Sequence, residues 1–212
     1  MQNTGHFVGI IEKNFDNFIL IGSDKDIITE LSFCELTIIG YTSINKRSDI
    51  PFKFLCEAKN LENIPNNTGL IVTVDDINLR KFLLKTKYES LATYISPHST
   101  VSKNCTVGKG SFIQSNCFVS SDCIIGKCVK INVGVQIHHD SIIGDCCVLA
   151  PGSIGLGHSN IGEGTYIGAG AIIREKIRVG FNTIIGMGSV VVRDIPDSVM
   201  AYGNPARLIR GV

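Results

Sequence analysis

Residues 131–149 read INVGVQIHHDSIIGDCCVL, and an aliphatic residue stands at every sixth position of this stretch. The same spacing continues in both directions, and Gly155 is its single exception between residues 95 and 191. Helices repeat about every 3.6 residues and strands every two, so neither pattern alone gives a period of six. A period of six is typical of a solenoid built from hexapeptides. The aliphatic positions are Ile95, Val101, Val107, Ile113, Val119, Ile125, Ile131, Ile137, Ile143, Leu149, Ile161, Ile167, Ile173, Val179, Ile185 and Val191.

A second, longer period indicates that three hexapeptides make one coil. Glycine recurs every eighteen residues, where a tight turn or a close approach of two backbones favours it. The residue four places after each aliphatic position is usually small, which suits a corner. We therefore predict a mainly β protein in which residues 94–212 form a triangular parallel β-helix with a C-terminal tail. The glycines that carry the longer period are Gly108, Gly126, Gly144, Gly162 and Gly180.

Composition and charge exclude several classes of protein. The net charge is +1, so nothing in the charge balance favours nucleic acid as a partner. No segment is apolar for long enough to cross a membrane. Residues 1–5 are polar and do not form the basic start of a secretory signal, so we expect a cytoplasmic protein.

The eight cysteines are interpreted as structural side chains rather than as metal ligands or a disulfide set. Four of them occupy the small corner position of the repeat, where serine, threonine or alanine stands in other coils. No CxxC pair occurs, and a free buried cysteine behaves as a small hydrophobic residue that suits a reducing compartment. These four cysteines are Cys105, Cys117, Cys123 and Cys147.

Residues 1–93 lack the period of six and are predicted to form a small α/β, Rossmann-like domain. Apolar runs at 18–22, 36–41 and 70–74 indicate three buried strands. Ser23 is expected to cap a helix that buries Ile27, Ile28 and Leu31, and Asp75 or Asp76 a second helix with Leu79, Phe82 and Leu83. Alternating strands and helices favour a parallel sheet.

Ligands of such sheets bind beyond the carboxyl ends of the strands. This rule directs attention to 22–26, 42–43 and 75–78, although Gly22-Ser23-Asp24-Lys25-Asp26 is not a GxGxxG fingerprint. The alternative is that the domain only caps one end of the solenoid. The candidate substrate-binding residues are Asp24, Lys25, Asp26, Ser43 and Asp75.

The chain has five histidines, and the pair at 138–139 lies in the middle of the solenoid. Ile137 is expected to point inward, so a neighbouring side chain faces solvent beside Asp140. A carboxylate next to an imidazole fixes its tautomer and raises its basicity, which suits a general base. The alternative is a surface histidine pair without a role. A zinc site between adjacent coils is also considered, but His139 and His158 are nineteen residues apart, which places them out of register, and a third histidine is missing.

The chain resembles the hexapeptide-repeat acetyltransferases that modify sugars. The resemblance rests on 132–140, Ile143-Gly144-Asp145, Leu149-Ala150-Pro151-Gly152, 184–191 and Gly203-Asn204-Pro205-Ala206-Arg207. It is greatest to enzymes that acetylate the 4-amino group of nucleotide-linked amino sugars, and a sister group O-acetylates sialic acid. Both groups carry a small α/β domain before a left-handed β-helix.

The resemblance implies a homotrimer with active sites between neighbouring β-helices, acetyl-CoA as the co-substrate and no metal. It implies that His139 is the general base and Asp140 its carboxylate partner. Coenzyme contacts are expected at Val148, Ala169 and Met187. Some relatives bind the acetyl thioester with a histidine at the position of Val148. In this chain the backbone amide of Gly157 or Gly168 is expected to serve instead. It further implies that Lys25 contacts a phosphate of the nucleotide sugar.

The function predicted from the sequence is N-acetylation of a nucleotide-activated amino sugar for bacterial surface glycan synthesis. The sugar amine attacks the thioester directly, because no cysteine occupies a nucleophile position beside His139. O-acetylation of a sialic-acid-like sugar is the first alternative. Serine O-acetylation is less compatible, since those relatives have a helical N-terminal domain. A non-catalytic solenoid scaffold is the alternative from another class.

Overall fold

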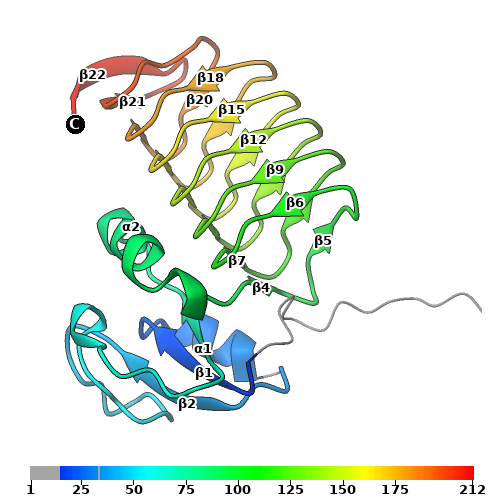
Figure 1. Ribbon diagram of the computed structural model, residues 1–212. Helices are drawn as coiled ribbons and strands as arrows, with labels where there is room; N and C mark the ends of the chain where they lie inside the picture. The colour runs from blue at the N-terminus through cyan, green and yellow to red at the C-terminus, as the bar shows by residue number, and fades with distance from the viewer. Residues whose placement is uncertain (1–14, 33) are drawn as a thin grey trace, which may run out of the picture.

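The computed structural model describes residues 15–32 and 34–212, and Figure 1 shows two parts, an α/β part and a stack of coils. The polar residues 1–5 and one of the five histidines, His6, lie outside the described residues. No helix of the described chain has the length and apolar character that a membrane crossing needs. The α/β part holds β1 (Asn17–Ile21), α1 (Lys25–Ser32), β2 (Ile38–Thr42), η1 (Ala58–Asn60), β3 (Thr68–Val72), α2 (Ile77–Thr86) and η2 (Tyr88–Ser90).

The three strands of the α/β part form the predicted parallel sheet, and their order in it is β2-β1-β3. Helix α1 buries Ile27, Ile28 and Leu31, which confirms its predicted apolar face. Its predicted cap is wrong, because the carboxylate of Asp24 accepts the Asp26 N–H (2.9 Å) while the Ser23 hydroxyl bonds that of Ser43 (3.0 Å).

Of the two caps proposed for the second helix, Asp76 is the one that forms. Its carboxylate accepts the backbone N–H of Leu79 at 3.0 Å, which satisfies one of the free donors of the first turn of α2. Asp75 is thereby left to make a different contact, with the β-helix.

From Tyr94 onward the chain forms a left-handed parallel β-helix of two-residue strands, with three faces (Figure 1). Sheet I contains β4 (Tyr94–Ile95), β7 (Phe112–Ile113), β10 (Lys130–Ile131), β13 (Val148–Leu149), β16 (Tyr166–Ile167), β19 (Ile184–Ile185), β21 (Val199–Tyr202) and the antiparallel β22 (Arg207–Gly211). Sheet II contains β5 (Thr100–Val101), β8 (Phe118–Val119), β11 (Gln136–Ile137), β14 (Ile154–Gly155), β17 (Ile172–Ile173) and β20 (Val190–Val191). Sheet III contains β6 (Thr106–Val107), β9 (Ile124–Ile125), β12 (Ile142–Ile143), β15 (Asn160–Ile161) and β18 (Arg178–Val179).

The aliphatic residues of the six-residue period form the core of this β-helix, as predicted. Each strand pairs with the strand eighteen residues further along, for example Ile137 with Gly155 and Ile143 with Ile161. The inward residues therefore stack in columns, and all except Val101 and Val107 are buried. Because each coil buries its apolar side only against its neighbours, no coil is stable alone.

The small corner residues do more than fill space. Their hydroxyl or thiol donates to the backbone carbonyl fifteen residues further, in the next coil, as Ser111 does to Gly126 (2.8 Å) and Cys147 to Gly162 (3.0 Å). A buried carbonyl without a partner costs about 1–3 kcal/mol, so a donor is preferred at this position. This explains why cysteine alternates with serine and threonine there, and all eight cysteines are free.

The glycines of the eighteen-residue period permit close packing of successive coils. A Cβ on Gly144 would lie 2.5 Å from the backbone nitrogen of Glu163, and one on Gly162 would lie 2.5 Å from that of Phe181. Neither neighbour is a side chain that can move away. The glycine column is therefore required by contact between backbones.

Three corner columns separate the sheets, and each contains residues with φ in the left-handed region. Corner I/II holds Asn116, Gly134, Gly152, Gly170 and Gly188. Corner II/III holds Asp122, Asp140, His158 and Lys176. Corner III/I holds Gly110, Cys128, Cys146, Gly164 and Asn182.

The α/β part packs on sheet I and on corner III/I. Tyr94 and Phe112 of sheet I stack at 4.9 Å and share one apolar cluster with helix α1. The buried Arg80 of α2 donates to the carbonyls of Val72 and Val74 in its own part and of Cys128 in the β-helix, each at 2.8 Å. These bonds fix how the two parts sit against each other.

Candidate functional site

His139 and Asp140 lie at corner II/III, just after β11, and form the pair that the sequence predicts. Nδ1 of His139 lies 2.8 Å from Oδ2 of Asp140, and the two side chains are 54% and 45% exposed. When Nδ1–H donates to the carboxylate, Nε2 keeps its lone pair. The pair can therefore take a proton from a bound molecule.

Gly157, one coil further, lies directly against the imidazole of His139. A Cβ at Gly157 would lie 2.7 Å from both Cε1 and Nε2 of His139, so only glycine leaves room for the ring. The Gly157 N–H has no backbone partner among the described residues, and Gly157 is buried beneath the imidazole in the single chain. Gly157 was expected at the coenzyme site, and the structure places it beside the base.

His158 joins the same corner although, as predicted, it is one residue out of register with His139, since it occupies the position equivalent to Asp140. Its φ of 59° turns it back toward the preceding coil, and its N–H donates to the His139 carbonyl at 2.9 Å. The two rings are 5.2 Å apart, edge to face, and His158 Nε2 lies 3.8 Å from Asp140 Oδ2. The two imidazoles therefore meet through their side chains, although their backbone positions differ by one residue from the eighteen-residue period.

His138 turns to another environment, as alternation along the strand predicts. Its ring packs edge to face on Phe118 with centroids 6.1 Å apart, and its carbonyl accepts the thiol of Cys123. Burial raises the pKa of that thiol to about 11. Cys123 is thus a protonated structural thiol, and no thiolate nucleophile stands behind this corner.

Besides Gly157, the residues expected to contact the coenzyme lie in two places, corner I/II and sheet I. Ala169 and Met187 are exposed on successive coils of corner I/II, where the Gly188 N–H donates to the Ala169 carbonyl at 2.8 Å and Gly168 packs against the backbone of Met187. Val148 lies on sheet I and is fully buried, so the expected coenzyme contact at Val148 is wrong. Its side chain faces the side of the β-helix that the α/β part covers.

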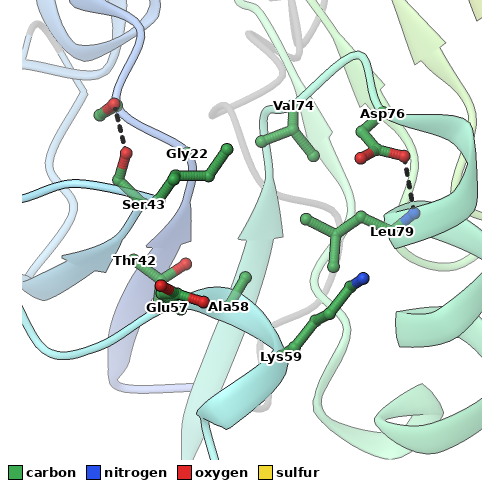
Figure 2. Close-up of a pocket in the computed structure, with 11 residues that line it drawn as sticks. Gly22, Thr42, Ser43, Glu57, Ala58, Lys59, Val74, Asp76 and Leu79 are labelled. Atoms are coloured by element: carbon green, nitrogen blue, oxygen red, sulfur yellow. Dashed lines mark hydrogen bonds between the residues drawn. The ribbon is translucent and has the colours of Figure 1, made fainter.

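The α/β part contains a cavity of about 310 Å³ at the carboxyl ends of its strands. Figure 2 shows Ser43 and Leu79 on opposite sides of this cavity, with Lys59 extending from the segment around η1. The position agrees with the expectation that ligands bind beyond the strand ends. The lining residues are Gly22, Ser23, Thr42, Ser43, Ile44, Glu57, Ala58, Lys59, Val74, Asp76 and Leu79.

Of the five predicted substrate-binding residues, only Ser43 lines the cavity. The Lys25 ammonium lies 2.7 Å from Asp49, and that ion pair and Arg47 hold the pKa of the Asp49 carboxyl well below its usual range. Asp24 caps α1, and Asp26 is exposed in its first turn.

Asp75 forms an ion pair between the two parts of the chain rather than lining the cavity. Its carboxylate lies 2.7 Å from Nζ of Lys130 and within 3.5 Å of the Asn132 amide. Burial lowers the pKa of Lys130, and Asp75 opposes that effect. Asp75 thus holds the α/β part against sheet I.

Some cavity residues come from outside the strand ends and were not predicted from the sequence. Lys59 and Glu57 lie on the long segment between β2 and β3, and Leu79 lies on α2. Nothing in the local pattern of that segment places it over the sheet. The Asp76 cap signal was the only clue to the helical side of the cavity.

The cavity and the His139 corner lie on opposite sides of one chain. The α/β part covers sheet I, which corners III/I and I/II border, whereas His139 lies at corner II/III, the one edge that does not border sheet I. A substrate cannot bridge the two through the solid core of the β-helix.

Solved structures with this two-part architecture cover nearly the whole chain. Perosamine N-acetyltransferase from Caulobacter crescentus aligns with a TM-score of 0.81 and 28% identity, over 91% of this chain and 96% of that one. The acetyltransferase domain of PglB from Neisseria gonorrhoeae aligns with a TM-score of 0.84 and 25% identity, over 92% of this chain and 100% of that one. This chain has the fold of the hexapeptide-repeat acetyltransferases.

Two of these structural neighbours were solved with bound ligands. The PglB domain was solved with acetyl coenzyme A, and the perosamine enzyme with CoA and GDP-perosamine. In two structures of the perosamine enzyme a histidine is replaced, by asparagine or by alanine. WeeI from Acinetobacter baumannii, at 22% identity and a TM-score of 0.81, shows the same fold. No protein-family model matches this chain, and no curated protein sequence matches it.

The contact between Gly157 and His139 gives the first prediction. Gly157→Ala should lower kcat roughly tenfold or more, because the new methyl group displaces the imidazole by more than the small error that catalysis tolerates. The melting temperature should change little, since the displaced ring is an exposed side chain. Steady-state kinetics and thermal denaturation measure the two effects. Gly211→Ala, where the new Cβ would make only an ordinary contact of 3.8 Å with the Ser198 carbonyl, is the matched control. Equal rates for both variants would show that the ring position does not matter.

Proposed function

We propose that this protein transfers acetyl from acetyl-CoA to the 4-amino group of a nucleotide-linked amino sugar. The observation that carries the proposal is the His139–Asp140 pair, whose Nε2 lies beside Gly157 on a fold shared with acetyltransferases. The reaction would take place in the bacterial cytoplasm, in the synthesis of surface glycans.

The proposed chemistry requires one base and one donor. As the sugar amine attacks the thioester carbonyl, Nε2 of His139 takes the proton that the amine loses, and Asp140 stabilises the resulting imidazolium. The free N–H of Gly157 donates to the carbonyl oxygen as negative charge develops on it. The coenzyme leaves as a thiolate and receives the proton from His139. The products are an amide and free CoA, without an acyl-enzyme.

We further propose that the nucleotide occupies the cavity of the α/β part. Its volume lies at the lower end of the range of small-molecule sites, and it presents both a cation and hydroxyl groups. The ammonium of Lys59 would contact a phosphate, and Ser43 and Thr42 would donate hydrogen bonds. Lys25 is less suited, because Asp49 already pairs with it.

The opposite positions of the cavity and His139 lead us to propose a homotrimer. A neighbouring copy would bring its cavity to the His139 corner, and the coenzyme would lie between the two β-helices, where it meets Ala169 and Met187. Apolar side chains on both sides of the His139 corner support a covered surface. Phe118, Ile124 and Ile142 are 40%, 49% and 42% exposed in the single chain.

The central prediction concerns the base. His139→Ala should lower kcat by ~10²–10⁴, the usual contribution of a positioned base, with acetyl-CoA affinity almost unchanged. Asp140→Asn should cost less, and His138→Ala, whose ring packs on Phe118, should cost least. Single-turnover assays with UDP-, dTDP-, GDP- and CMP-linked amino sugars measure the order. An inactive His138→Ala with a fully active His139→Ala would refute the assignment, and transfer to a hydroxyl sugar alone would favour O-acetylation.

The nucleotide cavity gives a second kinetic prediction. Lys59→Ala should raise the KM for the nucleotide sugar roughly tenfold, as expected for loss of one hydrogen bond to a charged group, and leave the KM for acetyl-CoA unchanged. Lys25→Ala, a lysine on the same face of the α/β part, should have a smaller effect because Asp49 holds it. If Lys25→Ala has the larger effect, the phosphate lies at the start of α1 instead.

The trimer is tested by mass in solution. Light scattering of the wild type at micromolar concentration should give three times the chain mass. Ile142→Glu should shift the protein toward monomer and lower activity in parallel, because a carboxylate would be buried at the contact. Thr29→Glu, an exposed position on α1, serves as the control. A wild-type monomer with full activity would rule out a site shared between copies.

A further inference from the structure

We propose that His139, Asp140 and His158 chelate a divalent transition metal such as Zn²⁺, and that the bound metal blocks the general base. One nitrogen from each imidazole and one carboxylate oxygen lie within 4.8 Å of one another. The site is thus an inhibitory one, separate from any requirement for catalysis. Metal binding stands on these side chains alone, whereas the inhibition rests on the proposed function.

The stacking of coils preorganises the three side chains. Asp140 and His158 occupy equivalent left-handed positions of corner II/III, with φ of 58° and 59°. Equivalent positions of neighbouring strands are about 4.8 Å apart. The hydrogen bond from the His158 N–H to the His139 carbonyl fixes the second coil against the first at this point. The backbone therefore holds the ligands together before any metal arrives.

The choice of His at 158 is not explained by the turn itself. Left-handed φ favours glycine, asparagine and aspartate, and these residues fill many of the other corner positions. The imidazole of His158 packs against no apolar cluster of the described chain and is 51% exposed. Its contacts are with His139 and Asp140, the two residues at the base.

The donor set suits zinc better than magnesium or calcium. Two imidazoles and a carboxylate are the ligands of many three-residue zinc sites, in which water takes the fourth tetrahedral position. In a tetrahedral site with zinc bonds of about 2.0–2.1 Å the donors lie roughly 3.3 Å apart, so His158 would move closer to Asp140 than 3.8 Å and the 2.8 Å contact between His139 and Asp140 would open slightly. All three side chains are about half exposed and free to rotate into place.

The charges around the corner are balanced. Asp122 precedes Asp140 in the column and Lys176 follows His158, and both are exposed. The Lys176 N–H donates to the Gly157 carbonyl at 3.0 Å, so Lys176 lies in the coil that follows that of His158. A cation bound at Asp140 therefore also has the carboxylate of Asp122 in the preceding coil of the same corner.

Metal on His139 would remove the lone pair that accepts the proton. The metal can bind only deprotonated imidazole, so binding should strengthen as pH rises. Acetyl-CoA would still bind, because its expected contacts lie outside the three ligands. The enzyme would then be active without metal and inhibited by it, and chelators would restore its activity.

Metal binding to the dialysed full-length protein tests the proposal directly. Isothermal titration with ZnCl₂ should show one site per chain, and His158→Asn should weaken binding at this site by about tenfold or more, since one of three ligands is lost. Asparagine accepts left-handed φ, so the fold should be retained. His98→Asn, at an exposed histidine away from this corner, should bind zinc as the wild type does.

Cobalt spectra separate this site from the free cysteines. Co²⁺ bound by His139, Asp140 and His158 should give visible ligand-field bands without the near-ultraviolet charge transfer of a cobalt thiolate. Equal zinc affinity in the wild type and His158→Asn, or a thiolate spectrum, would overturn the proposal.

Rate measurements with and without zinc distinguish the metal-site proposal from the proposed function. Zinc should lower the rate of the wild type, EDTA should restore it, and the ratio of rates with and without zinc should be closer to one in His158→Asn. If no sugar is acetylated while zinc binding still depends on His158, the proposed function fails and the metal site stands. Binding at this site without any loss of rate would overturn the inhibitory role.

Discussion

Backbone hydrogen bonds between successive coils are the constraint on which this structure depends. The Ile142 N–H donates to the Ser159 carbonyl and the Gly144 N–H to the Ile161 carbonyl, and the same pattern repeats along each sheet. Because the register is fixed at eighteen residues, equivalent side chains stack in columns with a set spacing. The inward columns must be aliphatic, the glycine column must lack a Cβ, and the small column supplies donors to buried carbonyls. The columns of side chains at the surface are not constrained by this packing and can hold catalytic or binding residues.

The candidate site lies in such a surface column, at corner II/III. His139 and Asp140 are neighbours in the chain, but the position of the imidazole depends on Gly157 in the next coil, and His158 approaches through a left-handed turn of that coil. The base, the free N–H of Gly157 and the second imidazole therefore come from two coils that the backbone holds in register. The same preorganisation that suits proton transfer also suits chelation of a metal, so activity and inhibition would share one geometry.

The α/β part is attached firmly and away from this corner. Arg80 donates to the Val72 and Val74 carbonyls in its own part and to the Cys128 carbonyl across the boundary, and the buried Lys130 pairs with Asp75. Removing Asp75 would leave the buried Lys130 ammonium without its carboxylate partner, so this contact favours a fixed attachment of the two parts. A rigid cavity on the side opposite His139 is the physical reason to expect that a second copy completes the site.

The sequence by itself determined the β-helix, its inward residues, the order of elements in the α/β part and the His139–Asp140 pair. All of these follow from periodicity or from neighbours in the chain, so local geometry is enough. Tertiary structure alone decided the rest. Lys59 reaches the cavity because a long segment folds over the sheet, Val148 is buried because the α/β part covers sheet I, and Asp75 turns to Lys130. His158 meets His139 because the next coil stacks directly on the first and their side chains reach each other at one corner. Such contacts join segments far apart in the chain, and their distances depend on packing that no local pattern encodes.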